Sequence, residues 1–96
     1  MASNFRITTL RGQKSTEFRL EGDFDGTSAF ELLHTMEDKC SGGGRVVVDT
    51  SQLRHVHPFG RDTFCNMLYL VKHLPIHLEF TGEKASWIAP ERNRFF

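Results

Sequence analysis

The segment RVVVDTSQL, residues Arg45–Leu53, gives the clearest indication of the fold. Its three consecutive valines are β-branched and apolar, and such an unbroken run is typical of a strand that is covered on both faces. The glycines immediately before it, residues 42–44, can adopt the positive φ that ends a helix. We therefore expect residues 46–48 to form a central strand that follows a helix.

Apolar residues upstream of the glycines recur at helical spacing and predict one buried stripe. The stripe would consist of Phe30, Leu33, Met36 and Cys40. Ser28 and Glu31 match a capping box, in which the hydroxyl bonds a backbone amide three residues on and the carboxylate reaches back. We expect the helix to start at Ser28.

Short segments near the amino terminus alternate apolar and polar residues. Residues 5–7 with Leu10, and then residues 18–20, stand on either side of a polar stretch over residues 11–16. Alternation with a period of two predicts strands, and the short polar connection predicts an antiparallel hairpin.

The second half of the chain repeats the pattern of a helix followed by a strand. A second apolar stripe at helical spacing ends at Pro75, which cannot continue a helix. It consists of Phe64, Met67, Leu68, Val71 and Leu74. Residues 76–80 then alternate up to Gly82, and residues 83–89 predict a short helix that places Trp87 and Ile88 on the sheet.

The predicted order is β-β-α-β-α-β, and strand-helix-strand units require parallel pairing with right-handed crossovers. The expected fold class is α/β: a small sandwich with a mixed, mostly parallel four-stranded sheet packed by helices and closed by a short helix or tail. The chain of 96 residues is expected to form a single domain, residues 1–96.

Composition narrows the classes of function. Lys and Arg together number 12, as do Asp and Glu, so no overall field favours nucleic acid or an anionic membrane. We see no apolar stretch of the roughly 20 residues that a membrane span needs, and no signal peptide. Cys40 and Cys65 lack CxxC spacing and are expected to be free thiols. These features predict a cytoplasmic protein.

Three segments in this order resemble the STAS domain, the fold of bacterial anti-sigma factor antagonists. Residues 22–25, GDFD, are similar to the family's Gly-Glu-Leu-Asp turn before its first helix. Residues 46–53 resemble its strand ending in Asp-Leu-Ser, and residues 78–82 resemble the strand that follows. The resemblance covers about residues 5–82, and the family's final strand and long last helix are abbreviated or absent here.

The resemblance fails in the loop that carries the family's regulatory chemistry. At the positions of its Asp-Ser-Ser-Gly motif this chain has His57, Pro58, Phe59 and Gly60, so only the glycine is retained. The serine that a partner kinase phosphorylates corresponds to Phe59, which has no hydroxyl. Phosphorylation, which would add about −1.5 to −2 charges, cannot operate at this position. Pro58 still suits the first turn of a helix.

The resemblance implies a non-catalytic bacterial regulatory module that binds a protein partner and needs no cofactor. The predicted contact residues are His55, His57, Pro58, Phe59, Gly60, Arg61 and Asp62, with Asp23 and Asp25 on the preceding turn. The partner would be an anti-sigma kinase-like regulator or another STAS subunit, or alternatively the ATPase of an ABC lipid-transport complex. A homodimer is also expected. Phe59 could point outward as an apolar anchor or fold under the helix into the core.

Hypotheses of metal binding or catalysis depend on residue types alone. His55 and His57 could bind zinc with a third ligand from Asp49, Asp62 or Cys65, which would make a small metal-dependent enzyme. Ser51, a histidine at position 55 or 57, and Asp49 are the residue types of a catalytic triad, with Ser51 as the nucleophile. Asp23 and Asp25 could act as paired acid and base carboxylates. The simpler interpretation makes the aspartates and Ser51 turn residues, and Cys65 a structural thiol.

The end of the chain leaves several interpretations open. Phe95 and Phe96 could pack back on the domain, join a partner or be exposed, and residues 92–96 mix aromatic and basic side chains. In a chain without net charge, this one short tail does not predict a nucleic-acid partner.

Overall fold

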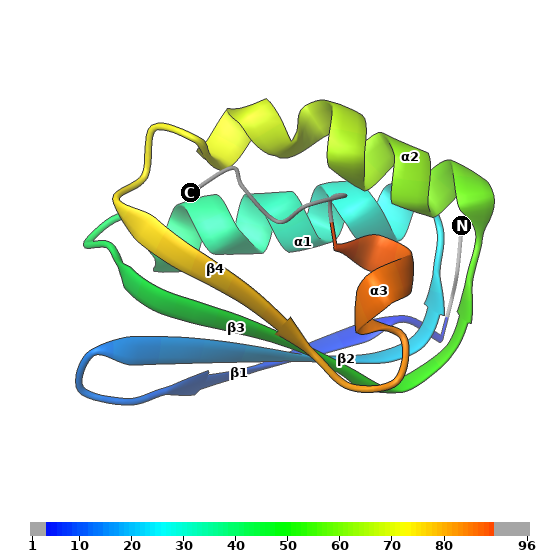
Figure 1. Ribbon diagram of the computed structural model, residues 1–96, viewed down its shortest axis with the longest axis horizontal. Coiled ribbons are helices and arrows are strands. Elements are labelled where there is room, and N and C mark those ends of the chain that lie inside the picture. Colours follow the sequence, from blue (N-terminus) through cyan, green and yellow to red (C-terminus); the bar gives the residue numbers. More distant parts are fainter. Residues whose placement is uncertain (1–3, 90–96) are drawn as a thin grey trace.

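The elements follow one another in the predicted order. The computed structural model describes residues 4–89. Its elements are β1 (Arg6–Arg11), β2 (Ser15–Phe24), α1 (Gly26–Lys39), β3 (Gly44–Val56), α2 (Pro58–Met67), the 3-10 helix η1 (Leu68–Val71), β4 (Ile76–Thr81) and α3 (Ala85–Ile88). The predicted β-β-α-β-α-β order is therefore confirmed, with α3 as the short closing helix (Figure 1).

The strands form one four-stranded sheet in the order β1-β2-β3-β4. β1 and β2 make the expected antiparallel hairpin, whereas β2, β3 and β4 are parallel. Phe18 of β2 stands beside Val48 of β3, which stands beside Phe80 of β4. β3 lies between two parallel neighbours, so its predicted central position is confirmed.

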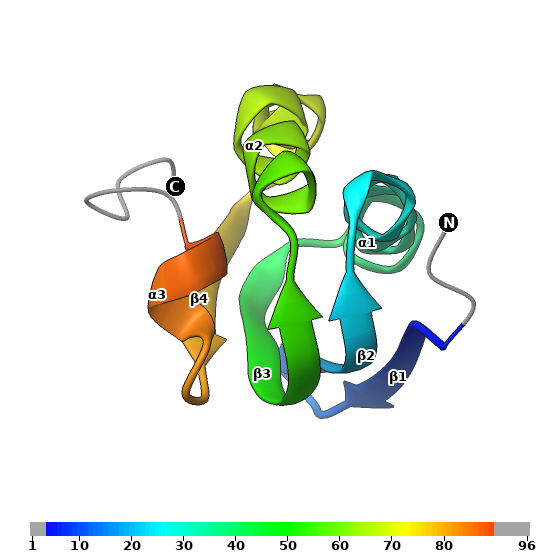
Figure 2. The same cartoon turned by 90° about the vertical axis from the view of Figure 1, so that its right-hand side faces the viewer.

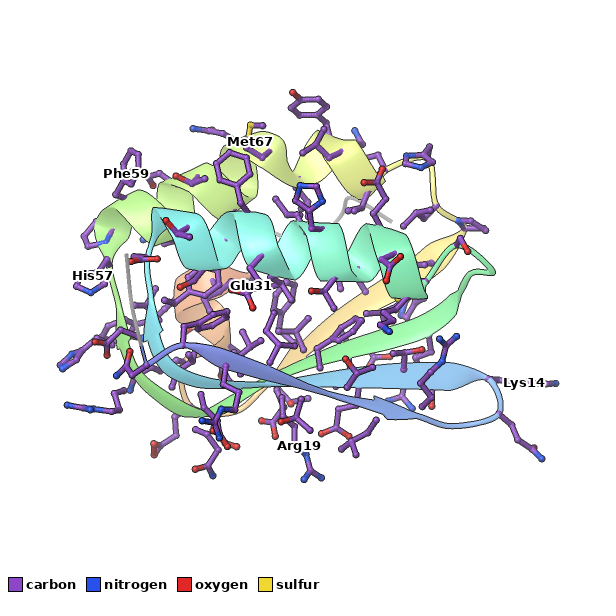
Figure 3. All side chains as sticks on the ribbon, turned by 180° about the vertical axis from the view of Figure 1, so that it is seen from behind. Lys14, Arg19, Glu31, His57, Phe59 and Met67 are labelled. Atoms are coloured by element: carbon purple, nitrogen blue, oxygen red, sulfur yellow. The ribbon has the colours of Figure 1, made fainter. Side chains whose placement is uncertain are left out.

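The helices cover one face of the sheet and leave the other open (Figures 1 and 2). Val46 and Val48 are buried under the helices, but Val47 is only half-buried because successive side chains of a strand point to opposite faces. The expectation that the valine run is covered on both faces is therefore wrong. Figure 3 shows Arg19 projecting from the open face, where it bonds Glu17.

Aromatic rings link the sheet to the helix layer. Phe24 of β2 contacts Phe64 of α2 edge-on, at 6.1 Å between ring centroids, and Phe64 contacts Phe80 of β4 at 6.0 Å. Both Phe24 and Phe64 are fully buried. Such pairs add about 0.5–1.5 kcal/mol each beyond the area that they bury.

Helix α1 begins earlier than predicted. Asp25 is its N-cap, and its carboxylate accepts from the backbone amide of Ser28 at 2.9 Å. Ser28 is thus inside the first turn, where its hydroxyl donates to Asp25 and to the carbonyl of Asp23. The predicted capping box at Ser28 is wrong because an aspartate three residues earlier takes the capping position.

The buried stripe of α1 also differs from the prediction. Leu33, Met36 and Cys40 are buried as expected, but Phe30 is 43% exposed. Ala29 and Leu32 take the inward positions instead. Ala29, Leu32 and Met36 follow one another at spacings of three and four residues, which places them on one face of the helix, toward the sheet. The helix ends at Cys40 with a negative φ, and the positive φ values occur later, at Gly43 and Gly44, where the chain turns into β3.

The last helices agree with the sequence prediction only in part. Helix α2 begins at Pro58, and η1 continues it toward Pro75. In α3, Ile88 is buried but Trp87 is 53% exposed, so the predicted packing of Trp87 on the sheet is wrong. Consecutive residues of a helix point in different directions, and in this one-turn helix Ile88 takes the inward position. Phe95, Phe96 and the rest of residues 90–96 lie outside the described residues.

Two further expectations concern cysteines and membranes. Cys40 and Cys65 are both free thiols, as expected. Among the described residues we find no helix long and apolar enough to cross a bilayer.

Candidate functional site

The starts of α1 and α2 meet at one corner of the molecule. Strands β2 and β3 are parallel neighbours, so both of their carboxyl ends reach the same edge of the sheet and both following helices begin there. The backbone amide of His57 donates to the carbonyl of Phe24 at 2.9 Å, which joins the two turns directly. Figure 3 shows His57 and Phe59 projecting from this end.

Two glycines allow this close approach. A Cβ on Gly60 would lie 2.6 Å from the carbonyl oxygen of Phe24 and 2.7 Å from backbone atoms of Asp25. A Cβ on Gly26 would lie 2.7 Å from the ring of Phe59. A real Cβ is not found this close to another heavy atom, so position 60, which faces backbone atoms, requires glycine, whereas a side chain at position 26 would displace the ring of Phe59. The ring of Phe59 thus lies directly on the first turn of α1.

A shallow hollow of about 320 Å³ opens between the two helix starts. We name its lining the corner surface: Asp25, Gly26, Thr27, Phe30 and Phe59. Phe59 is 74% exposed and Phe30, one helical turn after Gly26, is 43% exposed. Of the two orientations open for Phe59, the structure has the outward one. Two exposed phenyl rings beside a capping carboxylate form an apolar patch with a polar rim.

The predicted contact residues are only partly brought together. Pro58, Phe59, Arg61 and Asp62 are exposed on the first turn of α2, and Gly60 is buried beneath them. His57 is the N-cap of α2, with no side-chain hydrogen bond to the helix. Asp25 lines the hollow. The backbone amides and polar side chains here can hydrogen-bond a partner around the apolar centre.

Asp23 and His55 lie away from the corner surface. They are neighbours across β2 and β3 and do not line the hollow. The Oδ1 atom of Asp23 is buried and has no hydrogen-bond partner among the described residues. The carbonyl of Asp23 accepts the hydroxyl of Ser28. Asp23 and Asp25 therefore shape the turn into α1 and do not form a carboxylate pair at the hollow.

The zinc hypothesis finds no third ligand. No three His, Cys, Asp or Glu side chains within residues 4–89 are grouped to hold a metal ion. Asp49 accepts from the amide of Ser51 and from the hydroxyl of Thr81, and Asp62 is paired with Arg61. The prediction that Asp49 and Ser51 form a turn is wrong, because both lie inside β3, which continues to Val56. The expected bond from a side chain to a nearby amide is present, at 3.0 Å from the amide of Ser51 to the carboxylate of Asp49.

Cys65 lies under α3, where its sulfur is 4.0 Å from the carbonyl oxygen of Ile88. Burial raises the pKa of the Cys65 thiol above its usual value, and Arg61 opposes this shift only in part. The thiolate is the reactive form, so this environment suits a structural thiol and disfavours a nucleophile.

Sequence reasoning missed three members of the corner surface, namely Gly26, Thr27 and Phe30. One signal was present: Gly26 and Phe30 are four residues apart, which places them on one side of a helix. The start of α1 at Gly26 was needed to use that signal, and the incorrect start at Ser28 concealed it.

Comparison with known proteins supports the fold. No family model matches the chain, and no curated protein matches its sequence. Among solved structures, it resembles an antisigma-factor antagonist STAS domain from Rhodobacter sphaeroides (15% identity, TM-score 0.67), covering 86% of this chain and 91% of that one. It also resembles a protein from Shewanella loihica PV-4 of the DUF3478 family, described as having a SpoIIAA-like fold (19% identity, TM-score 0.58), covering 99% of this chain and 84% of that one.

A third solved structure, Mglu, has 18% identity and a TM-score of 0.67 over 88% of this chain. The chain spans only 20% of the length of Mglu. Together these likenesses show a STAS-like, SpoIIAA-like fold, which confirms the resemblance seen in the sequence at the level of fold. At identities this low, the likeness shows the fold and does not establish an activity or a partner.

Proposed function

We propose that this protein is a non-catalytic regulatory module that binds a protein partner through the corner surface. The observation that carries the proposal is the exposure of Phe59, which is 74% exposed in the first turn of α2, beside the exposed ring of Phe30. Large aromatic side chains dominate interface energies when a partner buries them. The ring of Phe59 lies against Gly26, and this contact favours the outward rotamer and so lowers the side-chain entropy that binding would cost.

The site has the position of a phosphorylation loop without its chemistry. The family that the sequence resembles places its phosphorylated serine where this chain has Phe59. Thr50, Ser51 and Thr63 carry hydroxyl groups near this end of β3 and α2. Thr50 is fully buried and its hydroxyl is bonded to the carbonyl of Thr81. Thr63 is half-buried, and Ser51 is exposed but does not line the hollow. The proposal is therefore a partner contact that does not use phosphorylation at the position of Phe59.

The expected partners are bacterial proteins in the cytoplasm: an anti-sigma kinase-like regulator or another STAS subunit. Support comes from the STAS-like fold together with an antisigma-factor antagonist among its structural neighbours. The ATPase of an ABC lipid-transport complex is the second candidate, because the same surface on the same fold would serve it. A homodimer is proposed separately below.

The test uses affinity capture from the native host followed by binding of the purified partner. Recovery of a kinase-like regulator supports the first partner class, and recovery of a transporter ATPase supports the second. Phe59→Ala should weaken binding of that partner about 30-fold, as expected for an interface hot spot of roughly 2 kcal/mol. The matched control is Trp87→Ala, which removes an exposed aromatic ring from α3.

The stability of both variants separates a binding effect from unfolding. Both side chains are more than half exposed, so each substitution should change the free energy of unfolding by no more than about 0.5 kcal/mol. If the partner binds Phe59→Ala as tightly as the wild-type protein, the corner surface is not its contact site and the proposal fails.

A further inference from the structure

Strand β4 forms an edge of the sheet that the described residues leave unpaired. Within residues 4–89 the only strand that pairs with it is β3, so one side of its backbone has no strand beside it. Helix α3 contacts α2, β3 and β4 and lies beyond the carboxyl end of β4, on the β4 side of the molecule (Figures 1 and 2). An exposed edge of this kind is a template for pairing with another strand.

The register of β3 and β4 fixes which backbone groups point outward. The amide of Gly44 donates to the carbonyl of Pro75 at 3.1 Å, and Gly44 stands beside Ile76. Since bonding alternates along a parallel ladder, the odd-numbered residues of β4 bond β3. The amide and carbonyl groups of Leu78 and Phe80 therefore point toward the free edge, as does the carbonyl of Ile76, whose amide donates to the carbonyl of Leu74 at 2.8 Å.

This alternation limits how two copies of β4 can pair. In an antiparallel ladder, opposite residues are either both hydrogen-bonded or both not. A two-fold axis must then place one residue opposite its own copy. An axis between two residues would instead place a residue whose backbone points outward opposite one whose backbone points inward. An axis at Leu78 places Leu78 opposite its own copy, in the middle of the strand.

Charge complementarity selects this register. With the axis at Leu78, each His77 stands opposite the Glu79 of the second copy, and Ile76 stands opposite Phe80. His77 and Glu79 already lie on the same face, with 3.7 Å between Nε2 and Oε2 within one chain. Pairing therefore brings opposite charges together on the open face when His77 is protonated. When His77 is neutral, it can donate a hydrogen bond to the carboxylate of Glu79.

The neighbouring registers are worse. An axis at Glu79 places two carboxylates opposite each other, and an axis at His77 places two histidines opposite each other and brings Pro75 opposite Glu79. Like charges directly opposite in a sheet are destabilising. The other edge of the sheet, β1, offers no alternative, because it contains Arg6 and Arg11 and no acidic residue.

The apolar side of β4 favours the same contact. Leu78 and Phe80 are only partly buried, although they pack against the core. Two copies joined at Leu78 would cover these side chains mutually. On the open face, Arg45 already binds the carboxylate of Glu79 through two bonds of 2.7 and 3.0 Å, which orders that carboxylate before a second copy arrives.

We propose that a second copy of this chain pairs with the free edge of β4, antiparallel and centred on Leu78, to give a symmetric dimer with a continuous eight-stranded sheet. The self-complementary sequence Ile76-His77-Leu78-Glu79-Phe80 defines the contact. The corner surface contains no residue of β4, so this dimer and the proposed partner contact use different residues.

Sedimentation equilibrium of the full chain tests the dimer. The wild-type protein should dimerise with a dissociation constant on the order of micromolar. His77→Glu and Glu79→Lys should each weaken the dimer roughly tenfold, because His77→Glu places carboxylates opposite each other in both pairs and Glu79→Lys replaces the acceptor opposite His77 by a cation in both pairs. An equimolar mixture of these two variants should dimerise again, since both pairs are then of opposite charge. The control His73→Glu makes the same change at an exposed residue before β4 and should have no effect.

Cross-linking tests the register independently. The two Cα atoms of a hydrogen-bonded antiparallel pair are about 5.5 Å apart, within the range of a disulfide. With Cys65 replaced by serine, Leu78→Cys should form a disulfide-linked dimer on oxidation. His77→Cys alone should not, but should cross-link when it is mixed with Glu79→Cys.

Three results would overturn the proposal. A wild-type protein that stays monomeric at hundreds of micromolar would do so, as would a dimer that His77→Glu leaves as tight as before. Equal weakening by His73→Glu would show that net charge, and not the ladder, controls association. Should Glu79→Lys fail to fold, His77→Glu measured against His73→Glu decides the question alone.

Discussion

The contact between Gly60 and the turn before α1 holds the corner surface together, and Gly60→Ala measures it. A Cβ at this position would lie 2.6 to 2.7 Å from three backbone atoms of Phe24 and Asp25. Backbone atoms cannot rotate away as a side chain can, so α2 would have to move by several tenths of an ångström. Overpacking of this kind costs about 1–3 kcal/mol.

Helix propensity opposes this cost. Alanine is better than glycine inside a helix by about 0.8–1.0 kcal/mol. With an overpacking cost near the upper end of its range, Gly60→Ala should lower the free energy of unfolding by about 2 kcal/mol. In a domain of this size that loss lowers Tm by roughly 8–16 °C.

The matched control is Gly42→Ala. A Cβ at Gly42 would meet no atom within 4 Å, and this residue is not among the glycines with positive φ. The control should leave Tm unchanged or raise it slightly, by up to about 1 kcal/mol of stability. Thermal and urea unfolding of both variants would be compared with the wild-type protein. If Gly60→Ala is as stable as Gly42→Ala, the two helix starts are not in the close contact described and the corner surface is not rigid.

Three other predictions follow from buried or bonded groups. Thr50→Val should cost about 1–3 kcal/mol, because the fully buried hydroxyl bonds β4 and the chain before α3, and Thr50→Ser should lose less; equal losses in urea unfolding would contradict this. Cys65 should react with iodoacetamide much more slowly in the folded than in the unfolded protein, because burial raises the pKa of its thiol; equal rates would refute it. The hydrogen bond from Arg45 lowers the pKa of Glu79, so this carboxyl should titrate at a higher pH in Arg45→Gln when followed by NMR. The ion pair between Arg45 and Glu79 then stabilises the fold above the pKa that Glu79 has in the unfolded chain, and this stabilisation is lost as pH falls through its folded pKa. An unchanged titration midpoint of Glu79 in Arg45→Gln would argue against the ion pair.

The start of α1 shows where sequence patterns are ambiguous. Asp25 and Ser28 are both good capping residues, and only three positions separate them. The pattern of Ser28 and Glu31 favoured the later start, but Ser28 is buried and its hydroxyl is bonded to Asp25 and Asp23. The packing of the turn against α2, which no local pattern contains, decided between the two.

The orientation of Phe59 was equally undecided in the sequence. Its side chain could have entered the core, since α2 has a buried phenylalanine at Phe64. The first turn of α2 instead approaches the backbone at Asp25 so closely that only Gly60 fits beneath it. Phe59 is therefore directed outward, over Gly26, and makes the candidate site.

The sequence by itself determined the order of the elements, the antiparallel hairpin, the central strand and the start of α2 at Pro58. These features depend on local periodicity and on the backbone limits of proline and glycine, which neighbouring residues impose on each other. Only the tertiary structure decided which face of the valine strand is open, where Phe30 and Phe59 point, and that β4 has a free edge. Those features depend on which segments become neighbours in space, and side chains distant in sequence set the outcome.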